Sequence, residues 1–507
     1  MTRAPADVAL PVAVIREVEA RAMAELPEGT LMQRAAAGIA VVAQSMLRDA
    51  LGKVTGSRVV LLVGSGDNGG DALYAGARLA ARGARVDAIL VADRHHDAGA
   101  AALRRAGGRI SDGRDLLAAA ELVAAADLVV DGILGIGGRG ALREPAATLA
   151  AVARETDATV LAVDLPSGVD ADTGAVADAD AVIDADRTVV LGVLKPGLLV
   201  GAGASRSGDL AVVDIGLDLP SVAEADVVTF VGDVAAAAAL RRPGADDDKY
   251  TRGVVGVSAG SERYPGAGVL ATAGARHGLA GYVRFSGPAY RDVVVSWPDV
   301  VAGPGRIGVA GRTHCWVVGS GRGTDEDARL AVLDAAALDV PLLLDADALT
   351  VLADDAEVRA AVVARDAVTV LTPHDGEFAR ITGHAVGGDR LAAARAAAAS
   401  LRCVVLLKGS STVVASPSGA AYVALAAPPE LATAGSGDVL AGFAGSLLAH
   451  HHAVARLDDE VAARLLGVAA HVHGLAGATA VGEGRTITAS DVARALPDAV
   501  ARVRRVV

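Results

Sequence analysis

Cysteine, aromatic residues and positive charge are all scarce in this sequence of 507 residues. The two cysteines, Cys315 and Cys403, lie in apolar strand-like runs, which excludes a disulfide scaffold and predicts a reducing, cytoplasmic setting. Aromatic residues make up only 2%, so small side chains must fill the interfaces between helices and sheets. Lys and Arg number 47 against 60 Asp and Glu, a net charge of −13. Such a surface repels polyanions and argues against nucleic acid as a partner.

Long apolar segments are also missing. No uninterrupted apolar run approaches the ~20 residues of a membrane-spanning helix, and charged residues from Arg16 to Arg21 come too early for a secretory signal. A G-x-x-x-x-G-K-[ST] motif is absent, which excludes a P-loop enzyme. We therefore expect a homo-oligomeric enzyme whose partners are small molecules, with no membrane and no nucleic acid among them.

What the sequence does contain is a repeated alternation of apolar strands and Ala-rich helices. Runs such as SRVVLLVG and ATVLAVDLPSG are each followed by a helical stretch, which predicts an α/β fold with parallel sheets covered on both faces. The pattern breaks near residues 221–249, where a Pro-Gly pair and an acidic cluster are typical of an interdomain connection. We predict two domains, residues 1–220 and 225–507.

Three glycine-rich loops follow strands in the first half. The first runs from Gly64 to Asp71 (GSGDNGGD), the second follows Asp131 (DGILGIGGRG) and the third is VDLPSG, from Val163 to Gly168. Glycines allow a ligand to approach the backbone, and a helix N-terminus offers unpaired N–H groups to a phosphate. Each loop read alone is also compatible with a structural turn or a helix cap. Together they predict a ligand site at one edge of the sheet.

These loops, with LKPG at residues 194–197, resemble the NAD(P)H-hydrate epimerase family over about residues 10–218. The resemblance implies a Rossmann-like fold and interconversion of the R and S forms of the hydrated cofactor with a bound potassium ion. It implies Asp164 as a catalytic residue touching the substrate, and Asn68, Asp131 and Ser167 as potassium ligands. The sequence departs from the usual pattern at Asp67, where Asn is usual, and at Ala72, where Gly is usual. The residues implied to cradle the substrate are Asp67, Asn68, Gly69, Gly70, Asp71, Gly135, Ile136, Gly137, Gly138, Arg139, Gly140, Ala141 and Asp164.

The second half carries a different set of loops. Residues 433–438 (TAGSGD) open an apolar helix, where a glycine turn can form an anion hole and Asp438 can act as a base. Residues 408–412 (KGSST) supply a cation and three hydroxyls suited to a nucleotide phosphate. Other strands end in Asp345 with Asp347, and in Leu371-Thr372-Pro373-His374 followed by Glu377. Asp438 alone could simply cap its helix.

In their order along the chain, these segments and YPGA at residues 264–267 resemble the ribokinase-like fold over about residues 225–504, and its ADP-dependent NAD(P)H-hydrate dehydratase branch. Ala434 departs from the pattern, where Gly is usual. The resemblance implies ADP, with Mg²⁺, as co-substrate. It implies that Asp438 deprotonates the C6 hydroxyl, which attacks the β-phosphoryl group of ADP and releases AMP. The implied contacts to the hydrated cofactor are Ala267, Gly321, His374 and Asp438, and those to the nucleotide are Lys408, Gly409, Ser410, Ser411, Thr412 and Gly437.

Two alternatives stay open from the sequence. The second half could be a small-molecule kinase of the ribokinase type, although the YPGA and LTPH segments argue against it. The first half could be a ligand-binding module without catalysis.

Overall fold

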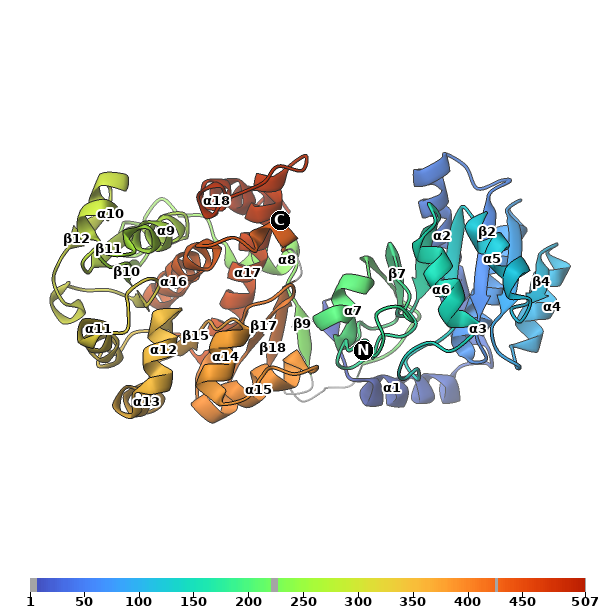
Figure 1. Cartoon of the computed structure of the whole chain (residues 1–507), viewed down its shortest axis with the longest axis horizontal. Helices are drawn as coiled ribbons and strands as arrows, with labels where there is room; N and C mark the ends of the chain where they lie inside the picture. Colours follow the sequence, from blue (N-terminus) through green and yellow to red (C-terminus); the bar gives the residue numbers. More distant parts are fainter. Residues whose placement is uncertain (1–6, 220–226, 425–426, 507) are drawn as a thin grey trace. The chain divides into compact units, whose positions relative to one another are not determined.

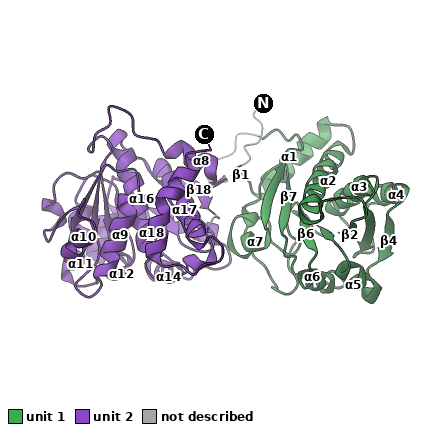
Figure 2. Cartoon of the chain, turned by 90° about the horizontal axis from the view of Figure 1, so that it is seen from above, with its two compact units in different colours: residues 1–223 green, residues 224–507 purple. Residues whose placement is uncertain are grey.

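The structure is a computed structural model that describes residues 7–219, 227–424 and 427–506. The chain divides into two compact units, residues 1–223 and 224–507, which Figure 2 shows in different colours. The domain boundary expected between residues 220 and 225 lies outside the described residues.

The first unit is built on a parallel sheet with the strand order β4-β3-β2-β5-β6-β7-β8. Val59 to Val63 of β2 are all buried, as expected for a central parallel strand covered on both faces. The order reverses between β2 and β5, the switch point at which open α/β sheets bind ligands. The strands are β1 (Val8–Ala9), β2 (Arg58–Val63), β3 (Arg85–Leu90), β4 (Arg109–Asp112), β5 (Leu128–Gly132), β6 (Thr159–Val163), β7 (Arg187–Leu191) and β8 (Asp209–Val213).

Helices cover the faces of this sheet (Figure 1). The helix α1 starts beside Leu194, because Leu10 N donates to the Leu194 carbonyl at 3.0 Å. The helices are α1 (Val12–Glu25), α2 (Thr30–Leu51), α3 (Asp67–Ala80), α4 (Asp97–Arg105), α5 (Leu116–Ala124), α6 (Ala146–Arg154), the short η1 (Pro196–Leu198) and α7 (Gly201–Arg206).

The second unit contains a larger sheet with the order β9-β18-β17-β16-β15-β14-β13-β10-β11-β12. Its strands are parallel from β12 to β16, and β17 runs antiparallel to both neighbours. The switch point lies between β10 and β13. The strands are β9 (Val228–Phe230), β10 (Val254–Ser258), β11 (Tyr282–Ser286), β12 (Val301–Gly303), β13 (Cys315–Val318), β14 (Leu342–Leu344), β15 (Thr369–Leu371), β16 (Val404–Leu407), β17 (Thr412–Ala415) and β18 (Ala421–Ala424).

Successive side chains of β13 point to opposite faces of this sheet and therefore join different clusters of the hydrophobic core. Cys315 and Val317 join the cluster that includes Phe443, whereas Trp316 and Val318 join a separate cluster with Leu349. Both cysteines are free and buried, as the sequence predicted. The helices are α8 (Asp233–Ala239), α9 (Pro265–Arg276), α10 (Tyr290–Ser296), η3 (Ile307–Val309), α11 (Glu326–Ala336), α12 (Asp347–Asp354), α13 (Ala356–Val363), α14 (Asp375–Thr382), α15 (Arg390–Leu401), η4 (Pro429–Leu431), α16 (Ser436–Val454), α17 (Asp459–Val481) and α18 (Ala489–Val503).

Small residues let α9 and α16 touch backbone to backbone. A Cβ on Gly274 would lie 2.0 Å from the Val439 carbonyl oxygen, and one on Gly442 would lie 1.8 Å from that of Ala271. Any side chain at either glycine would therefore push the helices apart. This contact fixes the N-terminal end of α16, with its GSGD turn, relative to α9.

Within the described residues, α17 alone is long and apolar enough to cross a membrane. In its most apolar stretch 83% of the residues are buried, and the helix contacts β16, β17, β18 and α18. Packing inside the unit accounts for this apolar character.

Candidate active sites

The first unit encloses a cavity of about 970 Å³ outside the carboxyl ends of β2, β5 and β6. This is the switch point of the sheet, where a ligand site is expected. The three glycine-rich loops meet here, as the sequence predicted. Of the residues implied to cradle a substrate, those that line the cavity are Asp67, Asn68, Asp71, Gly135, Ile136, Gly137, Gly138 and Asp164.

Gly69 and Gly70 are glycines for a packing reason and do not line the cavity. A Cβ on Gly69 would lie 2.4 Å from the Gly64 carbonyl oxygen, and one on Gly70 would lie 2.9 Å from the Met32 side chain. They let the first turn of α3 press against the end of β2 and against α2, which turns Asp67, Asn68 and Asp71 toward the cavity. In the second loop the lining residues stop at Gly138, so Arg139, Gly140 and Ala141 lie beyond them.

Asn68, Asp131 and Ser167 come together beneath the cavity. The Ser167 hydroxyl donates to Asp131 Oδ1 at 2.7 Å, and the Ser167 backbone N–H donates to Asp131 Oδ2 at 2.8 Å. Asn68 Nδ2 donates to the carbonyls of Leu134 and Val163, both at 2.9 Å. Complete burial raises the pKa of Asp131 to about 6. The result is a dense group of hard oxygen atoms around one buried carboxylate.

Asp164 is held by a contact that the sequence did not reveal. Its carboxylate forms an ion pair with Lys195, whose side chain is 0% exposed, and accepts the Leu191 backbone N–H at 3.0 Å. Asp164 also has a φ of 70°, a backbone conformation that costs energy for a residue other than glycine. The LKPG segment thus supplies the counter-charge for Asp164.

Helix α1 contributes further cavity residues that sequence reasoning missed, Arg16 and Glu19. Its buried positions Val12, Ile15 and Val18 follow an ordinary helical spacing, so the pattern predicts a plain amphipathic helix with a solvated polar face. Only the folded chain shows that part of this face closes the cavity.

Two carboxylates in this cavity are perturbed. Burial, followed by the charges of Asp164 and Asp67, raises the pKa of Asp71 well above its usual range. Burial and the charge of Asp164 likewise raise the pKa of Glu19. The Asp71 Oδ1 atom is buried without a hydrogen-bond partner, so it remains available to a bound molecule.

In the second unit, Asp345 at the end of β14 organises the predicted loops. Lys408 Nζ lies 2.8 Å from Asp345 Oδ1, and Thr372 donates to the same oxygen at 2.7 Å. Ser320 donates to Asp345 Oδ2 at 3.0 Å. Lys408 Nζ also lies 3.7 Å from Glu377 Oε2. The carboxyl ends of β13, β14, β15 and β16 are therefore joined by one polar network.

The GSGD turn lies beside this network. A Cβ on Gly437 would lie 3.6 Å from Lys408 Nζ, so the two predicted anion-binding loops face each other. Gly435 has a φ of 86° immediately before α16, a conformation that favours glycine. Burial and then the charge of Asp345 raise the pKa of Asp438 to about 7. A carboxylate poised near neutral pH is suited to general-base catalysis.

Ala267 and Gly321, which the resemblance implied as contacts of the hydrated cofactor, also lie against each other. A Cβ on Gly321 would lie 2.5 Å from the Ala267 Cβ, so only glycine fits there. His374 is the N-cap of α14: its Nδ1 accepts the backbone N–H of Gly376 at 3.0 Å, and its own backbone N–H donates to Glu377 Oε2 at 2.9 Å. This capping box fixes both side chains at the sheet edge.

The remaining predicted nucleotide contacts differ in exposure. Gly409 and Ser410 are exposed, whereas Ser411 and Thr412 are buried where β17 begins. A Cβ on Gly409 would lie 2.6 Å from the Arg390 guanidinium, so a second cation stands beside Lys408. Arg390 also donates to the Lys408 carbonyl at 2.8 Å.

Comparison with known proteins also matches the two units to two different families. A family described as YjeF-related protein N-terminus matches residues 28–197, and a family described as NAD(P)H-hydrate dehydratase matches residues 255–498. The bifunctional NAD(P)H-hydrate repair enzyme Nnr of Mycobacterium leprae is 47% identical over 86% of this chain and 88% of its own length. That of Corynebacterium glutamicum is 34% identical over 93% and 94%.

A crystal structure of the ADP/ATP-dependent NAD(P)H-hydrate dehydratase of Bacillus subtilis, co-crystallised with ATP and Mg²⁺, is 26% identical. It covers 54% of this chain and 98% of its own, with a TM-score of 0.46. The alternatives of a small-molecule kinase and a non-catalytic module are not favoured by the full-length matches. Both halves and the order of their motifs agree with those matches, and the chain belongs to the family of bifunctional NAD(P)H-hydrate repair enzymes.

Proposed function

We propose that the first unit's cavity is the epimerase site of this repair enzyme, and that the polar network around Asp345 and Asp438 is its dehydratase site. The enzyme epimerises the R and S forms of hydrated NADH and NADPH, and it dehydrates the S form with conversion of ADP to AMP and phosphate. The observation that carries the second assignment is the approach of Lys408 to Gly437 beside Asp438.

The dehydratase reaction must convert the C6 hydroxyl into a better leaving group. Asp438 removes the proton of this hydroxyl, and its oxygen attacks the β-phosphorus of ADP while the bond to the AMP oxygen breaks. Lys408 and the N–H groups at the start of α16 stabilise the charge on the transferring phosphoryl group. The C6–O bond then breaks, phosphate leaves with the bonding electrons, and loss of a proton from the neighbouring ring carbon to solvent restores the dihydronicotinamide.

Mg²⁺ is expected to enter this site with the nucleotide. No group of three or more His, Cys, Asp or Glu side chains that could hold a metal ion occurs in the described part of the chain. Asp345 is already engaged by Lys408, Thr372 and Ser320. Bound to ADP phosphates, Mg²⁺ would neutralise their charge.

In the epimerase site, Asp164 would contact the hydrated ring, with Lys195 holding its carboxylate in place. The Gly135–Gly138 loop and the start of α3 would receive the phosphates, because glycine backbone and helix N–H groups bind anions without a basic surface. Arg16 supports this placement, because its Nη2 would lie 3.2 Å from a Cβ on Gly137.

Asn68, Asp131 and Ser167 fit a potassium ion. Their oxygens, with the carbonyls of Leu134 and Val163, are the hard ligands that such a cation prefers. Within residues 7–219, Asp131 is met by hydrogen bonds from Ser167 and Ile133 and by no charged side chain, so a cation would offset the cost of burying this carboxylate. Asn68 would have to turn its amide so that the oxygen, not the nitrogen, faces the ion. Potassium would supply fixed positive charge beside the substrate.

The test is to supply a mixture of hydrate epimers and to follow NADH return by its absorbance. We expect repair only when ADP is present, with AMP and phosphate formed in equal amounts to NADH. Repair at the same rate without a nucleotide would contradict the proposed coupling. A cytoplasmic location and a homo-oligomeric assembly stay predictions. Light scattering would measure the oligomeric state.

A further inference from the structure

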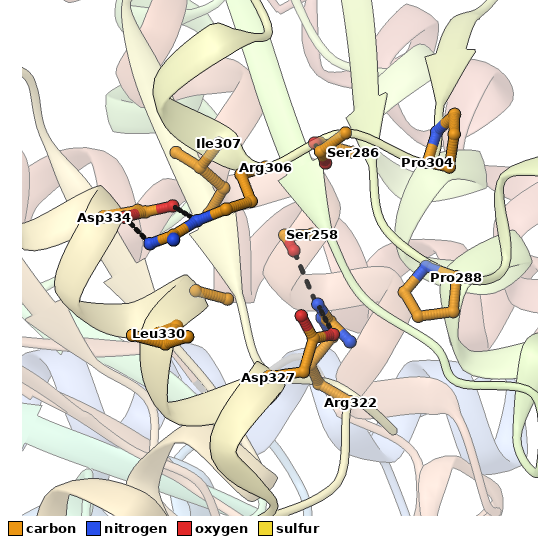
Figure 3. A pocket seen from close by; sticks show the side chains of 12 residues that line it. Ser258, Ser286, Pro288, Pro304, Arg306, Ile307, Arg322, Asp327, Leu330 and Asp334 are labelled. Atoms are coloured by element: carbon orange, nitrogen blue, oxygen red, sulfur yellow. Dashed lines mark hydrogen bonds and ion pairs between the residues drawn. The ribbon is translucent and has the colours of Figure 1, made fainter.

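A small cavity of about 80 Å³ lies outside the carboxyl ends of β10 and β11 (Figure 3). Ser258 and Ser286 end these strands, Arg322 follows β13, and Arg306 reaches it from the opposite side. Since an engineered apolar cavity of about 150 Å³ holds one benzene molecule, this smaller cavity suits a single phosphate group and is too small for a nucleoside.

Arg322 is an unusual residue to bury. It is 7% exposed, its Nε donates to the Ser258 hydroxyl at 3.4 Å, and its Nη2 lies 2.7 Å from Asp327 Oδ2. The Asp327 side chain is 60% exposed, so solvent screens this pair and its compensation for the buried guanidinium is small. An anion bound in the cavity beside Arg322 would compensate the buried positive charge of its guanidinium better.

Arg306 stands across the cavity from Arg322. It forms a two-pronged ion pair with Asp334, with Nε at 2.7 Å from the carboxylate. Figure 3 shows the two arginine–aspartate pairs on either side of the space. Both aspartates belong to α11. The Asp327 side chain is largely solvated, so it can turn outward into water and leave the Arg322 guanidinium to another ligand.

The position of the cavity, next to the proposed dehydratase site, indicates which ligand Arg322 binds. Arg322 directly follows Gly321, which meets Ala267 in the dehydratase site, and Ser258 marks the switch point between β10 and β13. Lys408 and Arg390 stand farther along the same sheet edge, beside β16. The edge thus has two separate groups of cations, whereas ADP needs only one of them.

We propose that Arg322, with Ser258 and Arg306, forms a phosphate-binding subsite for the hydrated dinucleotide in the dehydratase unit. This inference rests on the dehydratase function proposed above. The substrate carries a pyrophosphate in both its NADH and its NADPH form, and a further 2′-phosphate in the NADPH form. An arginine guanidinium can form paired hydrogen bonds to the oxygens of either group. No covalent step involves this subsite; it binds and orients.

The full-length protein is assayed with the S hydrates of NADH and NADPH at saturating ADP, comparing Arg322→Leu and Asp327→Asn with the wild type. Arg322→Leu is expected to raise the KM for the hydrate about tenfold or more, as loss of a charged hydrogen bond does. The KM for ADP should stay within about twofold. Asp327→Asn should lower the KM for the hydrate, because it removes the carboxylate that competes for Arg322.

The two variants therefore separate a binding role from a structural one. If the Arg322–Asp327 pair only ties the loop after β13 to α11, both variants lower Tm and neither changes KM, which overturns the proposal. A KM raised by Arg322→Leu for both hydrates identifies the pyrophosphate, and a KM raised for the NADPH hydrate alone identifies the 2′-phosphate. Arg456→Leu is the matched control, because Arg456 pairs with Asp339 on the surface away from this cavity.

Inorganic phosphate gives a readout that does not depend on catalysis. Phosphate at millimolar concentration should raise the Tm of Arg322→Leu less than that of the wild type and of Arg456→Leu, because the other phosphate-binding loops proposed above remain in all three proteins. Equal shifts in all three proteins would overturn the subsite. A wild type that shows the phosphate shift but does not restore NADH would refute the proposed function and leave the anion site standing. If Arg322→Leu does not fold, Arg322→Lys replaces it, with a smaller rise in KM expected because the fork is lost and the charge is kept.

Discussion

Lys195 and Asp164 form an ion pair at the floor of the first unit's cavity, with the lysine side chain completely buried. The two residues come from loops after β6 and β7, neighbouring strands of the sheet. The pair places one positive charge among the carboxylates of Asp164, Asp71 and Glu19. The pair explains why the LKPG segment belongs to this site, although the segment is not part of any of the three glycine-rich loops.

Lys195→Met is expected to destabilise the first unit by about 3–5 kcal/mol, because it leaves a buried carboxylate without its partner. Both tryptophans, Trp297 and Trp316, belong to the second unit. Far-ultraviolet circular dichroism should therefore show an earlier first transition while the tryptophan fluorescence transition stays in place. The double variant Lys195→Met/Asp164→Asn should recover part of the loss. A single variant that unfolds like the wild type would contradict the importance of the pair.

Asp438→Asn should lower the dehydratase kcat about 10²–10⁴-fold, because the amide cannot accept a proton. The KM for ADP should change little. Asp347→Asn is a suitable comparison: Asp347 Oδ2 accepts the Gly323 N–H at 2.8 Å and takes no part in the proposed chemistry. A kcat for Asp438→Asn within a few-fold of the wild type would remove Asp438 from the role of base.

The pH dependence follows from the raised pKa of Asp438, about 7. The base must be ionised, so kcat should level off above pH 8 and fall about tenfold per pH unit well below pH 7. The stability effect has the opposite sign. A carboxyl group whose pKa is raised on folding makes the folded state less stable as pH rises between its unfolded and folded values. Asp438→Asn should therefore raise the Tm of the second unit at pH 8 and leave it nearly unchanged at pH 4.

Potassium should support epimerisation better than sodium or an organic cation if Asn68, Asp131 and Ser167 hold it. Asp131→Asn should weaken this preference, because it removes the buried charge that the cation offsets. Epimer exchange is followed directly by NMR so that the dehydratase does not contribute. A rate that does not depend on the cation would count against the site.

Asp164→Ala in the full-length protein should make repair of a mixed hydrate sample biphasic. The S fraction should return to NADH at the wild-type rate, and the R fraction should follow at the slow spontaneous rate of epimerisation. The wild type should convert the whole sample in one fast phase. Biphasic repair by the wild type as well would mean that the first unit does not epimerise, and Asp67 would then be the first position to restore to Asn. A single fast phase from Asp164→Ala would instead remove Asp164 from the epimerase reaction.

The sequence by itself determined the α/β class and the glycine-rich loops, and most of the chemistry proposed for these loops was predicted from it. This was possible because an apolar parallel strand, a tight turn and a helix start are local features, so GSGDNGGD and AGSGD identify their sheet edges without any knowledge of distant residues. The meeting of the loops followed as well, since the carboxyl ends of parallel strands share one edge.

Only the tertiary structure decided which distant side chains complete each site. Arg16 and Glu19 follow no pattern that separates them from a solvated helix face, and the Lys195–Asp164 and Lys408–Asp345 pairs join residues far apart in the sequence. Arg322 is an unremarkable charge in the sequence, and becomes a candidate ligand only because the fold buries it. Charge, burial and pKa depend on what lies within a few ångströms in space, and spacing along the chain does not contain that information.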